Sequence, residues 1–431
     1  MPRRTACLAL VLGLLLGLAP IARAEEPVEA PVEATPLDEG SVDETPLEVI
    51  PVDEDPCAAP PCHRLVRYKR DKGLVLETHD NRTMWWIGVR TQLRFSTEPG
   101  TPRSVSDLND DQPDDTFLNR GRIKGGGYIG TKDVEFYSEY DWPADRLLDL
   151  RGTFRGSEKL GVRVGQWKSE FNRERIDSSG KQQFVERSIA TYWFTIDRQL
   201  GAIFSGRFGK GRAWDTSWWA GITAGTGRGG GLEQDNHLWI GRWQWNVTRR
   251  VLGFSQSDIK RRRKPAGSVT LAGAVGRSRY TRFSSGGGSQ LPGFSGGADG
   301  RYRIAQLMLE TAYQHRGFSW QQELHVKDVA DRLDGGESRT LWGGYAQAGY
   351  FFHGIARWVP CPLECAARYA LIDPDSDTGS DFQHEFTFAL NWFIRGHRNK
   401  LTADVSYLDF EDPTLGQADE WRFRLQWELS L

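Results

Sequence analysis

The chain has 431 residues, of which 39% are hydrophobic, 26% charged and 12% aromatic, and its formal net charge at pH 7 is −2. Its mean hydropathy is negative. After residue 24 no stretch of about 18 uncharged apolar residues occurs, which excludes a bundle of membrane-spanning helices. The 17 tryptophans exceed the number expected in an ordinary soluble domain, whereas a wall that crosses lipid headgroups favours tryptophan and tyrosine.

The amino terminus has the pattern of a secretory signal. Arg3 and Arg4 precede the apolar run 6–18, and the small-residue sequence Ala-Arg-Ala at 22–24 stands before Glu25. This order of basic, apolar and small residues predicts a cleaved signal peptide at residues 1–24. We therefore expect the mature protein to leave the cytoplasm and to have no nucleic-acid partner.

Residues 25–62 follow as an acidic, proline-rich segment. Its first part, residues 25–56, contains twelve carboxylates and neither lysine nor arginine. Little in it can pack into a core, so we predict a disordered segment on the periplasmic side. The rest of the chain carries more basic than acidic side chains, and this includes the basic run 260–264.

Apolar and polar residues alternate along many later segments, most clearly at the carboxyl end. In residues 420–431 one face is wholly apolar, formed by Trp421, Phe423, Leu425, Trp427, Leu429 and Leu431. A period of two indicates a strand whose faces meet different solvents. One such strand could also lie in a soluble sandwich. In an exported chain with many such segments, a closed barrel is the strand structure able to span lipid.

The alternation predicts an all-β fold, a transmembrane antiparallel β-barrel of about 16 strands in residues 63–431 of a bacterial outer-membrane protein. We expect outer-membrane lipid and lipopolysaccharide as its surroundings. Both ends of the barrel chain then fall in the periplasm, where turns are short. The predicted strands are 84–95, 118–129, 133–140, 146–154, 159–168, 200–208, 214–224, 237–247, 268–280, 303–314, 318–327, 339–352, 364–372, 382–393, 400–409 and 420–431.

Closure of such a barrel places its last strand beside its first. Inward-facing basic residues then form one stripe over three adjacent strands: Arg422 and Arg424, Arg90 and Arg94, and Arg120, Arg122 and Lys124. The planar guanidinium makes paired hydrogen bonds to oxyanions, and a row of cations passes an anion between sites of similar depth. Alternatively, mixed charges only hydrate the pore, as in a general diffusion porin.

The connection at about 169–199 is long enough to require a function. It contains Arg173, Arg175, Lys181 and Arg187, balanced by acidic residues. A polar loop without large net charge is suited to a constriction inside the barrel.

Four cysteines remain after removal of the signal peptide: Cys57, Cys62, Cys361 and Cys365. All map to the oxidising periplasmic side, where disulfides are expected. Local pairs 57–62 and 361–365 are the simplest connectivity, and cross-pairing would tether the acidic segment to the barrel. No metal-binding spacing of histidine and cysteine and no nucleophile motif occur, so we expect no metal, no cofactor and no catalysed reaction.

Several segments resemble the phosphate-selective porin O and P family: RVGQWKSEF (163–171), FVERS (184–188), DRQLG (197–201), WWAGITAGTG (218–227), GGYAQAGYFF (343–352), AARYALID (366–373) and ALNWFI (389–394). The resemblance implies a sixteen-stranded channel, usually trimeric, with the third loop folded into the lumen and a ladder of arginines. It also implies that Lys181 contacts the anion. The terminal Leu431 and the sequence FFHGI (351–355) depart from the family pattern and mark a divergent member.

These observations predict an outer-membrane channel for passive diffusion of small anions of the phosphate type, assembled as a homotrimer. Two alternatives remain open. One is a non-selective general porin, and the other is a structural or adhesive barrel without an open pore. Measuring the permeation of phosphate and chloride through the protein distinguishes these three hypotheses.

Overall fold

The computed structural model describes residues 66–69, 72–97, 100, 102–110, 113–333, 336 and 338–431. The predicted signal peptide, the acidic segment, Cys57 and Cys62 lie outside these residues. Those described belong to one compact unit. No helix within it is long and apolar enough to cross a membrane.

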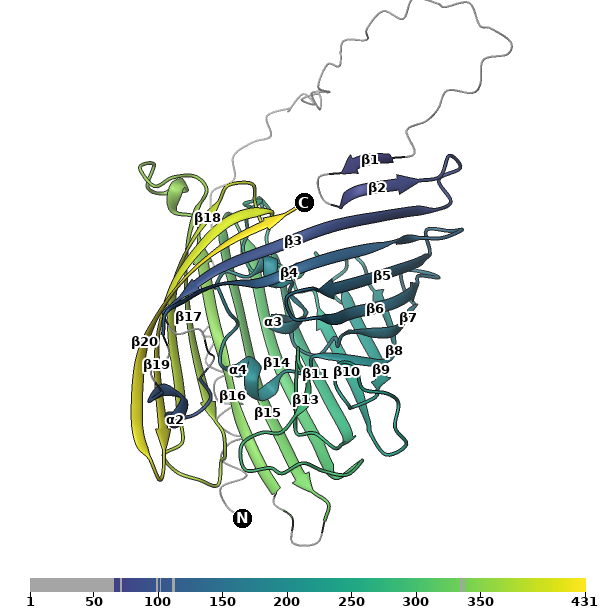
Figure 1. Cartoon of the computed structure of the whole chain (residues 1–431). Helices are drawn as coiled ribbons and strands as arrows, with labels where there is room; N and C mark the ends of the chain where they lie inside the picture. The colour runs from purple at the N-terminus through teal and green to yellow at the C-terminus, as the bar shows by residue number, and fades with distance from the viewer. Residues whose placement is uncertain are drawn as a thin grey trace, which may run out of the picture. The chain divides into compact units, whose positions relative to one another are not determined.

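Sixteen antiparallel strands of the described chain close into a barrel (Figure 1). They are β3 (Met84–Ser96), β4 (Asp115–Tyr128), β5 (Val134–Asp141), β6 (Arg146–Phe154), β7 (Gly161–Lys168), β8 (Arg198–Phe208), β9 (Thr216–Thr223), β10 (His237–Trp245), β11 (Ala266–Ser278), β14 (Tyr302–His315), β15 (Phe318–Asp331), β16 (Ser338–Tyr350), β17 (Leu363–Asp373), β18 (Gln383–Phe393), β19 (Asn399–Asp412) and β20 (Gly416–Ser430).

The barrel closes where β20 pairs with β3, from Arg424 opposite Ser96 to Ser430 opposite Arg90. Apolar side chains cover the outward face of the strands, and most polar ones point inward, together with buried apolar side chains that pack inside the barrel, such as Leu238 and Ile304. On β20, for example, Trp421 is 68% exposed whereas Arg424 is 3% exposed. The outward face meets lipid, because only an apolar solvent leaves so large an aromatic surface stable.

The prediction of a sixteen-stranded transmembrane barrel is confirmed, with differences at some strand ends. β4 begins at Asp115 instead of 118, β19 continues to Asp412 instead of 409, and β20 begins at Gly416 instead of 420. These three extensions lie at the barrel end opposite the carboxyl terminus. Inward-facing Phe410 and Ala418 belong there to an apolar cluster with Val105 and Leu108, so the alternation of an apolar outer and a polar inner face is lost.

A short hairpin at the start of the described chain was not predicted. It consists of β1 (Val66–Lys69) and β2 (Gly73–Glu77), and β2 pairs with the first part of β3, from Met84 to Ile87. β20 reaches only Arg90 on this same edge of β3. The hairpin therefore continues the pairing of β3 beyond the end of β20, beside the carboxyl terminus (Figure 1).

The third loop, residues 169–197, lies inside the barrel (Figure 1). It contains α3 (Arg173–Ile176), the 3-10 turn η1 (Ser179–Lys181) and α4 (Ala190–Phe194). The buried side chains of Phe171, Phe184 and Phe194 attach it to the wall.

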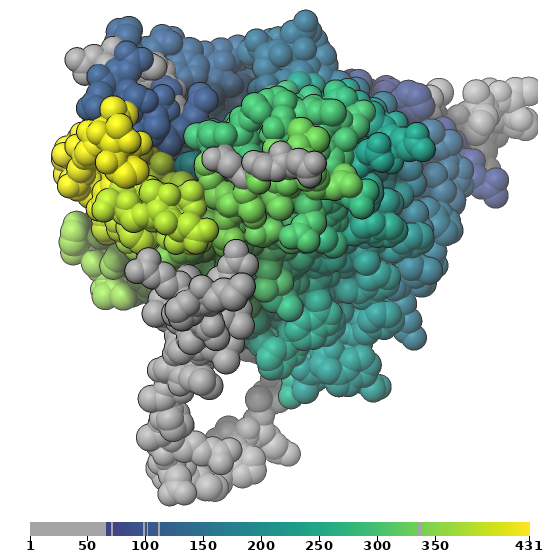
Figure 2. Space-filling view, turned by 90° about the horizontal axis from the view of Figure 1, so that it is seen from below, coloured from purple at the N-terminus to yellow at the C-terminus, as the bar shows by residue number. Residues whose placement is uncertain are grey.

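Shorter elements lie in other connections: α2 (Val105–Leu108), η2 (Phe352–Gly354), and the hairpin of β12 (Arg282–Ser284) and β13 (Gly287–Ser289). In the 279–301 connection, the backbone oxygen of Thr281 accepts a hydrogen bond from Lys327 on β15, and Arg282 donates to the oxygen of Tyr192 in α4. These contacts bring β12 and β13 onto the third loop. Seen from the loop end, green side chains lie across the middle of the barrel mouth (Figure 2).

Gly73 gives a test of the hairpin's attachment. Its φ is +83°, and a Cβ there would lie 2.3 Å from the backbone oxygen of Ile87. Gly416 has the same φ but nothing within 4 Å of the corresponding position. The left-handed backbone costs either alanine about 1 kcal/mol, whereas Gly73→Ala additionally clashes with β3. We expect Gly73→Ala, and not Gly416→Ala, to increase amide hydrogen exchange in residues 73–77, measured by mass spectrometry. Equal protection in both variants would contradict this attachment.

Candidate functional site

Carboxylates on the inner wall hold the third loop through its backbone. Glu323 on β15 accepts a hydrogen bond from the Glu174 amide at 2.6 Å, and Glu385 on β18 accepts one from the Ile189 amide at 2.8 Å. Asp404 on β19 accepts one from Val185 at 2.8 Å. A buried amide that loses its partner costs about 1–3 kcal/mol. These acidic groups therefore fix the path of the loop.

Within the loop, Glu174 performs a similar task. Its carboxylate accepts hydrogen bonds from the amide and hydroxyl of Ser188 and from the hydroxyl of Thr191, at 2.7–2.8 Å. Close packing accompanies these bonds. A Cβ on Gly349 of β16 would lie 1.9 Å from Nε2 of Gln183. The loop and this half of the wall form one packed body.

The 246–265 connection supports the loop from the carboxyl-terminal end of the barrel. The amide of Gln256 donates to the oxygen of Lys181 at 3.2 Å, and the Gln256 side chain accepts from the amide of Gln183 at 2.8 Å. Arg173 donates to the oxygen of Gly253 at 2.6 Å and lies 5.1 Å from the Phe254 ring centroid. Arg173 therefore has a structural role in this packing.

A small basic cavity remains between the loop and the β3–β8 side of the wall. Its volume is about 80 Å³, which is room for a few water molecules or one small anion. Seven of its eleven lining residues are basic. The lining consists of Asn119, Arg120, Arg122, Asp141, Arg146, Lys168, Arg175, Ser179, Arg187, Arg198 and Ser285.

Four of these cations are neutralised by carboxylates. Arg120 pairs with Glu186, Arg122 with Glu139 and Asp141, Arg175 with Asp197, and Arg198 with Asp149 and Asp197.

The other three cations, Arg146, Lys168 and Arg187, have no carboxylate within ion-pairing distance among the described residues. Lys168 and Arg187 instead donate to the backbone oxygen of Asp177, at 3.0 and 2.9 Å. The lining thus retains positive charge that its own carboxylates do not balance.

A larger cavity of about 350 Å³ adjoins the basic cavity on the side of the loop end. The two share Arg175, Arg187 and Ser285 in their linings. Arg103 and Arg282 lie over the ring of Tyr192 in the larger cavity, at 5.8 and 3.8 Å from its centroid. A vestibule with several cations therefore leads to the basic cavity.

The predicted basic stripe lies on the inner faces of β20, β3 and β4, but most of it is engaged in fixed contacts. Arg94 and Arg120 hold Glu186 of the third loop, Arg122 pairs with Glu139, and Arg424 pairs with Asp404.

The remaining stripe residues also have defined neighbours. Arg90 donates to the hydroxyls of Ser178 and Ser179, and Arg422 donates to the oxygen of Gly100. Lys124 lies opposite Glu139 in the β4–β5 register. Only Arg120 and Arg122 of the stripe line the basic cavity.

The four basic residues predicted in the third loop separate into different environments. Arg175 and Arg187 line both cavities, whereas Arg173 is buried against the 246–265 connection. Lys181 is exposed at the end of η1 and lines neither cavity. The structure therefore does not place Lys181 with Arg175 and Arg187.

Sequence reasoning missed Arg146, Lys168 and Arg198 as cavity residues. Lys168 ends β7, Arg198 begins β8, and the two are opposite each other in the register. Like charges directly opposite in a sheet are unfavourable unless another group offsets them. Two cations that flank one long loop are a signal in the sequence that could have identified Lys168 and Arg198 as residues of the cavity.

Cys361 and Cys365 are both free thiols in this structure. Cys365 lies on β17 between Tyr350 and Leu390 of the neighbouring strands, and Cys361 lies in the preceding connection. The predicted local bridge between them is not formed here. Since Cys57 and Cys62 lie outside the described residues, the connectivity of the four cysteines stays a prediction.

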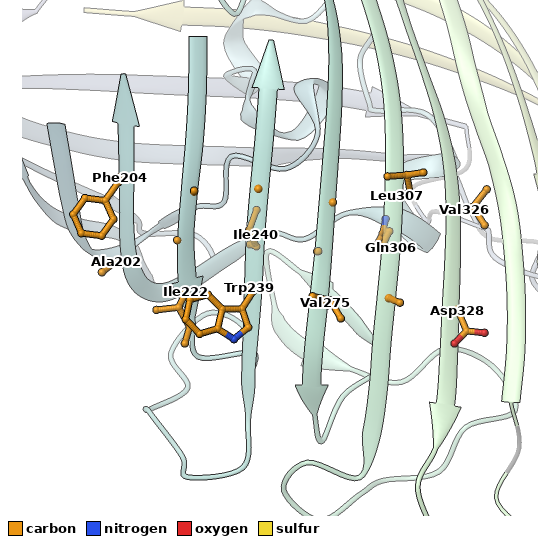
Figure 3. Close-up of a pocket in the computed structure, with 16 residues that line it drawn as sticks. Ala202, Phe204, Ile222, Trp239, Ile240, Val275, Gln306, Leu307, Val326 and Asp328 are labelled. Atoms are coloured by element: carbon orange, nitrogen blue, oxygen red, sulfur yellow. The ribbon is translucent and has the colours of Figure 1, made fainter. Parts of the chain in front are cut away.

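The outward face has a separate depression of about 780 Å³ across β8–β15 (Figure 3). Phe204, Ile222, Trp239 and Leu307 line it, and the lining contains no lysine or arginine. Its apolar character fits the lipid-facing side of the wall. It is not part of the basic path in the lumen. Among the described residues, no group of three or more histidine, cysteine or acidic side chains is arranged to hold a metal ion.

Comparison with known proteins identifies the family. The model of the phosphate-selective porins O and P matches residues 124–419, more than half of the chain. The chain belongs to the phosphate-selective porin O and P family. Comparison with curated proteins finds no match. Members of this family are outer-membrane channels, and the chain is accordingly a channel of the bacterial outer membrane.

Solved structures share the fold of this porin at low sequence identity. The outer membrane channel DcaP of Acinetobacter baumannii is 11% identical with a TM-score of 0.56, over 83% of this chain and 99% of that one. OmpT of Vibrio cholerae in its trimer form is 7% identical with a TM-score of 0.52, over 81% of this chain and 99% of that one. OmpF of Salmonella typhi in complex with daunomycin is 10% identical with a TM-score of 0.51, over 83% of this chain and 100% of that one.

Asp404 tests whether the wall carboxylates hold the loop of this porin. Asp404→Ala removes the acceptor of the Val185 amide and the carboxylate partner of the buried Arg424, so we expect the third loop to loosen and trypsin to cleave at Arg187. Asp409 is a matched control on the same strand, where its carboxylate accepts a hydrogen bond from Gln417 and, within the described part of the chain, holds no residue of the third loop. Limited proteolysis of both variants measures the effect. Resistance of Asp404→Ala equal to that of Asp409→Ala would contradict the anchoring role.

Proposed function

We propose that the protein is an anion-selective diffusion channel for small oxyanions of the phosphate type, without a catalysed reaction. The observation that carries the proposal is the basic cavity of about 80 Å³ with its three unbalanced cations, Arg146, Lys168 and Arg187. The family match supports the channel function, and the charge of the cavity supports the anion preference.

Electrostatics favours an anion in this cavity. A unit charge about 10 Å from an ion changes its energy by about 1–2 kcal/mol at an effective dielectric constant near 20. Three unbalanced cations at such distances outweigh the single lining carboxylate, Asp141, which already pairs with Arg122. The planar guanidinium groups of Arg146 and Arg187 also match the geometry of phosphate oxygens.

Passage requires that the anion also leave the cavity. Ion pairs in the lining limit this attraction. The carboxylates that pair with Arg120, Arg122, Arg175 and Arg198 repel the permeating anion. The vestibule that shares Arg175 and Arg187 offers a neighbouring site. Two adjacent sites of moderate depth permit conduction, whereas one deep site would trap the ion.

The double substitution Lys168→Gln with Arg187→Gln tests the selectivity. We expect the zero-current potential in a salt gradient across a lipid bilayer to shift toward cation preference, with the permeability ratio changed several-fold. Phosphate block of chloride current should weaken. Lys159→Gln is the control, because this exposed lysine lies in the 155–160 turn outside the basic cavity and the vestibule.

Other results would support the alternatives. If the parent discriminates neither chloride nor phosphate from cations, the protein is a general diffusion porin. If no current passes through the inserted parent protein, it is a structural barrel without an open pore.

A stripe variant, Arg90→Gln with Arg424→Gln, should change selectivity less than the double cavity variant, since neither residue lines the basic cavity.

We further propose a homotrimer. A family model of porins and a structural neighbour described as a trimer support this assembly. Native mass spectrometry of unheated protein in detergent should give three copies. A single copy under conditions that retain the barrel would exclude the trimer. The contacts with lipopolysaccharide stay a prediction.

A further inference from the structure

A second basic cavity of about 420 Å³ lies inside the barrel toward its carboxyl-terminal end, which is the periplasmic end. Its position follows from the inward-facing residues of β5. Asp141 lines the first cavity, Glu139 comes next along the strand, and Tyr137 and Glu135 line the second. The second cavity therefore lies on the periplasmic side of the first.

This cavity combines cations with aromatic rings, unlike the first. Its lining is Lys72, Met84, Trp86, Gly127, Tyr128, Lys132, Glu135, Phe136, Tyr137, Arg151, Thr153, Arg155 and Arg163. Arg155 pairs with Glu135 at 2.9 Å, and Arg163 pairs with Glu170. Lys72, Lys132 and Arg151 have no carboxylate partner among the described residues. Positive charge therefore remains here too.

The aromatic part is held in a defined arrangement. The rings of Trp86 and Tyr137 lie 6.0 Å apart at 44°, and the guanidinium of Arg151 lies 4.7 Å from the Tyr137 centroid. The Tyr137 hydroxyl donates to Glu139 at 2.7 Å. On the other side, Val75 of the β1–β2 hairpin packs with Met84, Tyr128 and Trp86. Contacts from both sides therefore fix these rings.

We propose that this cavity is a binding site for a phosphate monoester whose organic group carries a ring. The phosphate would contact Arg151 and the lysines Lys72 and Lys132, and the ring would pack on Trp86 and Tyr137. The proposal rests on the proposed function, because the ligand is an anion that enters the same channel. It adds a preference for an organic group that the 80 Å³ cavity cannot supply, since that cavity has no aromatic lining.

Paired esters separate the contribution of the ring from that of the charge. Methyl phosphate and phenyl phosphate carry a similar charge at pH 7.5, so their difference reports the organic group. We expect phenyl phosphate to block chloride current about 3- to 10-fold more strongly than methyl phosphate, a ratio typical of one aromatic contact. The block should be stronger when the ester is added on the periplasmic side of the bilayer.

Two neighbouring tryptophans provide the variant and its control. Trp86 points into the cavity, whereas Trp85 lies on the outward face and is 51% exposed. Trp86→Leu should remove the advantage of phenyl over methyl phosphate, and Trp85→Leu should retain it. Arg151→Gln should weaken the block by both esters. The unheated electrophoretic mobility of each variant verifies that the barrel has formed.

The outcomes distinguish this proposal from the proposed function. Equal block of the parent by both esters, with chloride current still blocked by inorganic phosphate, overturns the ring site and leaves the phosphate channel intact. Absence of block by inorganic phosphate and by both esters overturns the phosphate channel and the ring site together. The comparison of phenyl phosphate with methyl phosphate uses the parent protein alone, so it tests the ring site even if Trp86→Leu does not fold.

Discussion

The hydrogen bonds from the backbone of the third loop to wall carboxylates determine what the lumen can contain. Glu323, Glu385 and Asp404 each accept an amide of the loop, so the acidic side of the wall is covered. The open space is left beside β3–β8, where cations predominate in the lining. The same hydrogen bonds therefore fix the position of the loop and leave a permeation path that is lined mainly by cations.

This arrangement determines which charges inside the barrel act on a permeating ion. Acidic and basic residues both point into the barrel, and the sequence alone is equally compatible with charges that only hydrate an open pore. In the structure the carboxylates on β15, β18 and β19 are bonded to the loop or to arginine. Their charge is largely compensated locally, and the cations without such partners dominate the remaining space.

The fold was predictable because membrane strands obey a strict alternation. The sixteen strands and the closure of β20 on β3 follow from that alternation and from an even strand count. The site was less predictable. The spacing in a strand shows which residues point inward, but it does not show which of them an internal loop covers. Lys168 and Lys181 illustrate this: only the folded path of residues 169–197 places Lys168 in the cavity and Lys181 outside it.

The β1–β2 hairpin has a consequence for the assembly of the sheet. β20 pairs with Arg90–Ser96 only, so Met84–Ile87 would otherwise present unpaired amide and carbonyl groups along one edge. Such an edge is a template for adding a strand from another molecule. A chain beginning near residue 80 would contain every barrel strand and still have this open edge. Residues 73–77 therefore cover this edge of β3 and leave the sheet ending in the four-residue strand β1, and a very short edge strand is a poor template for association between barrels.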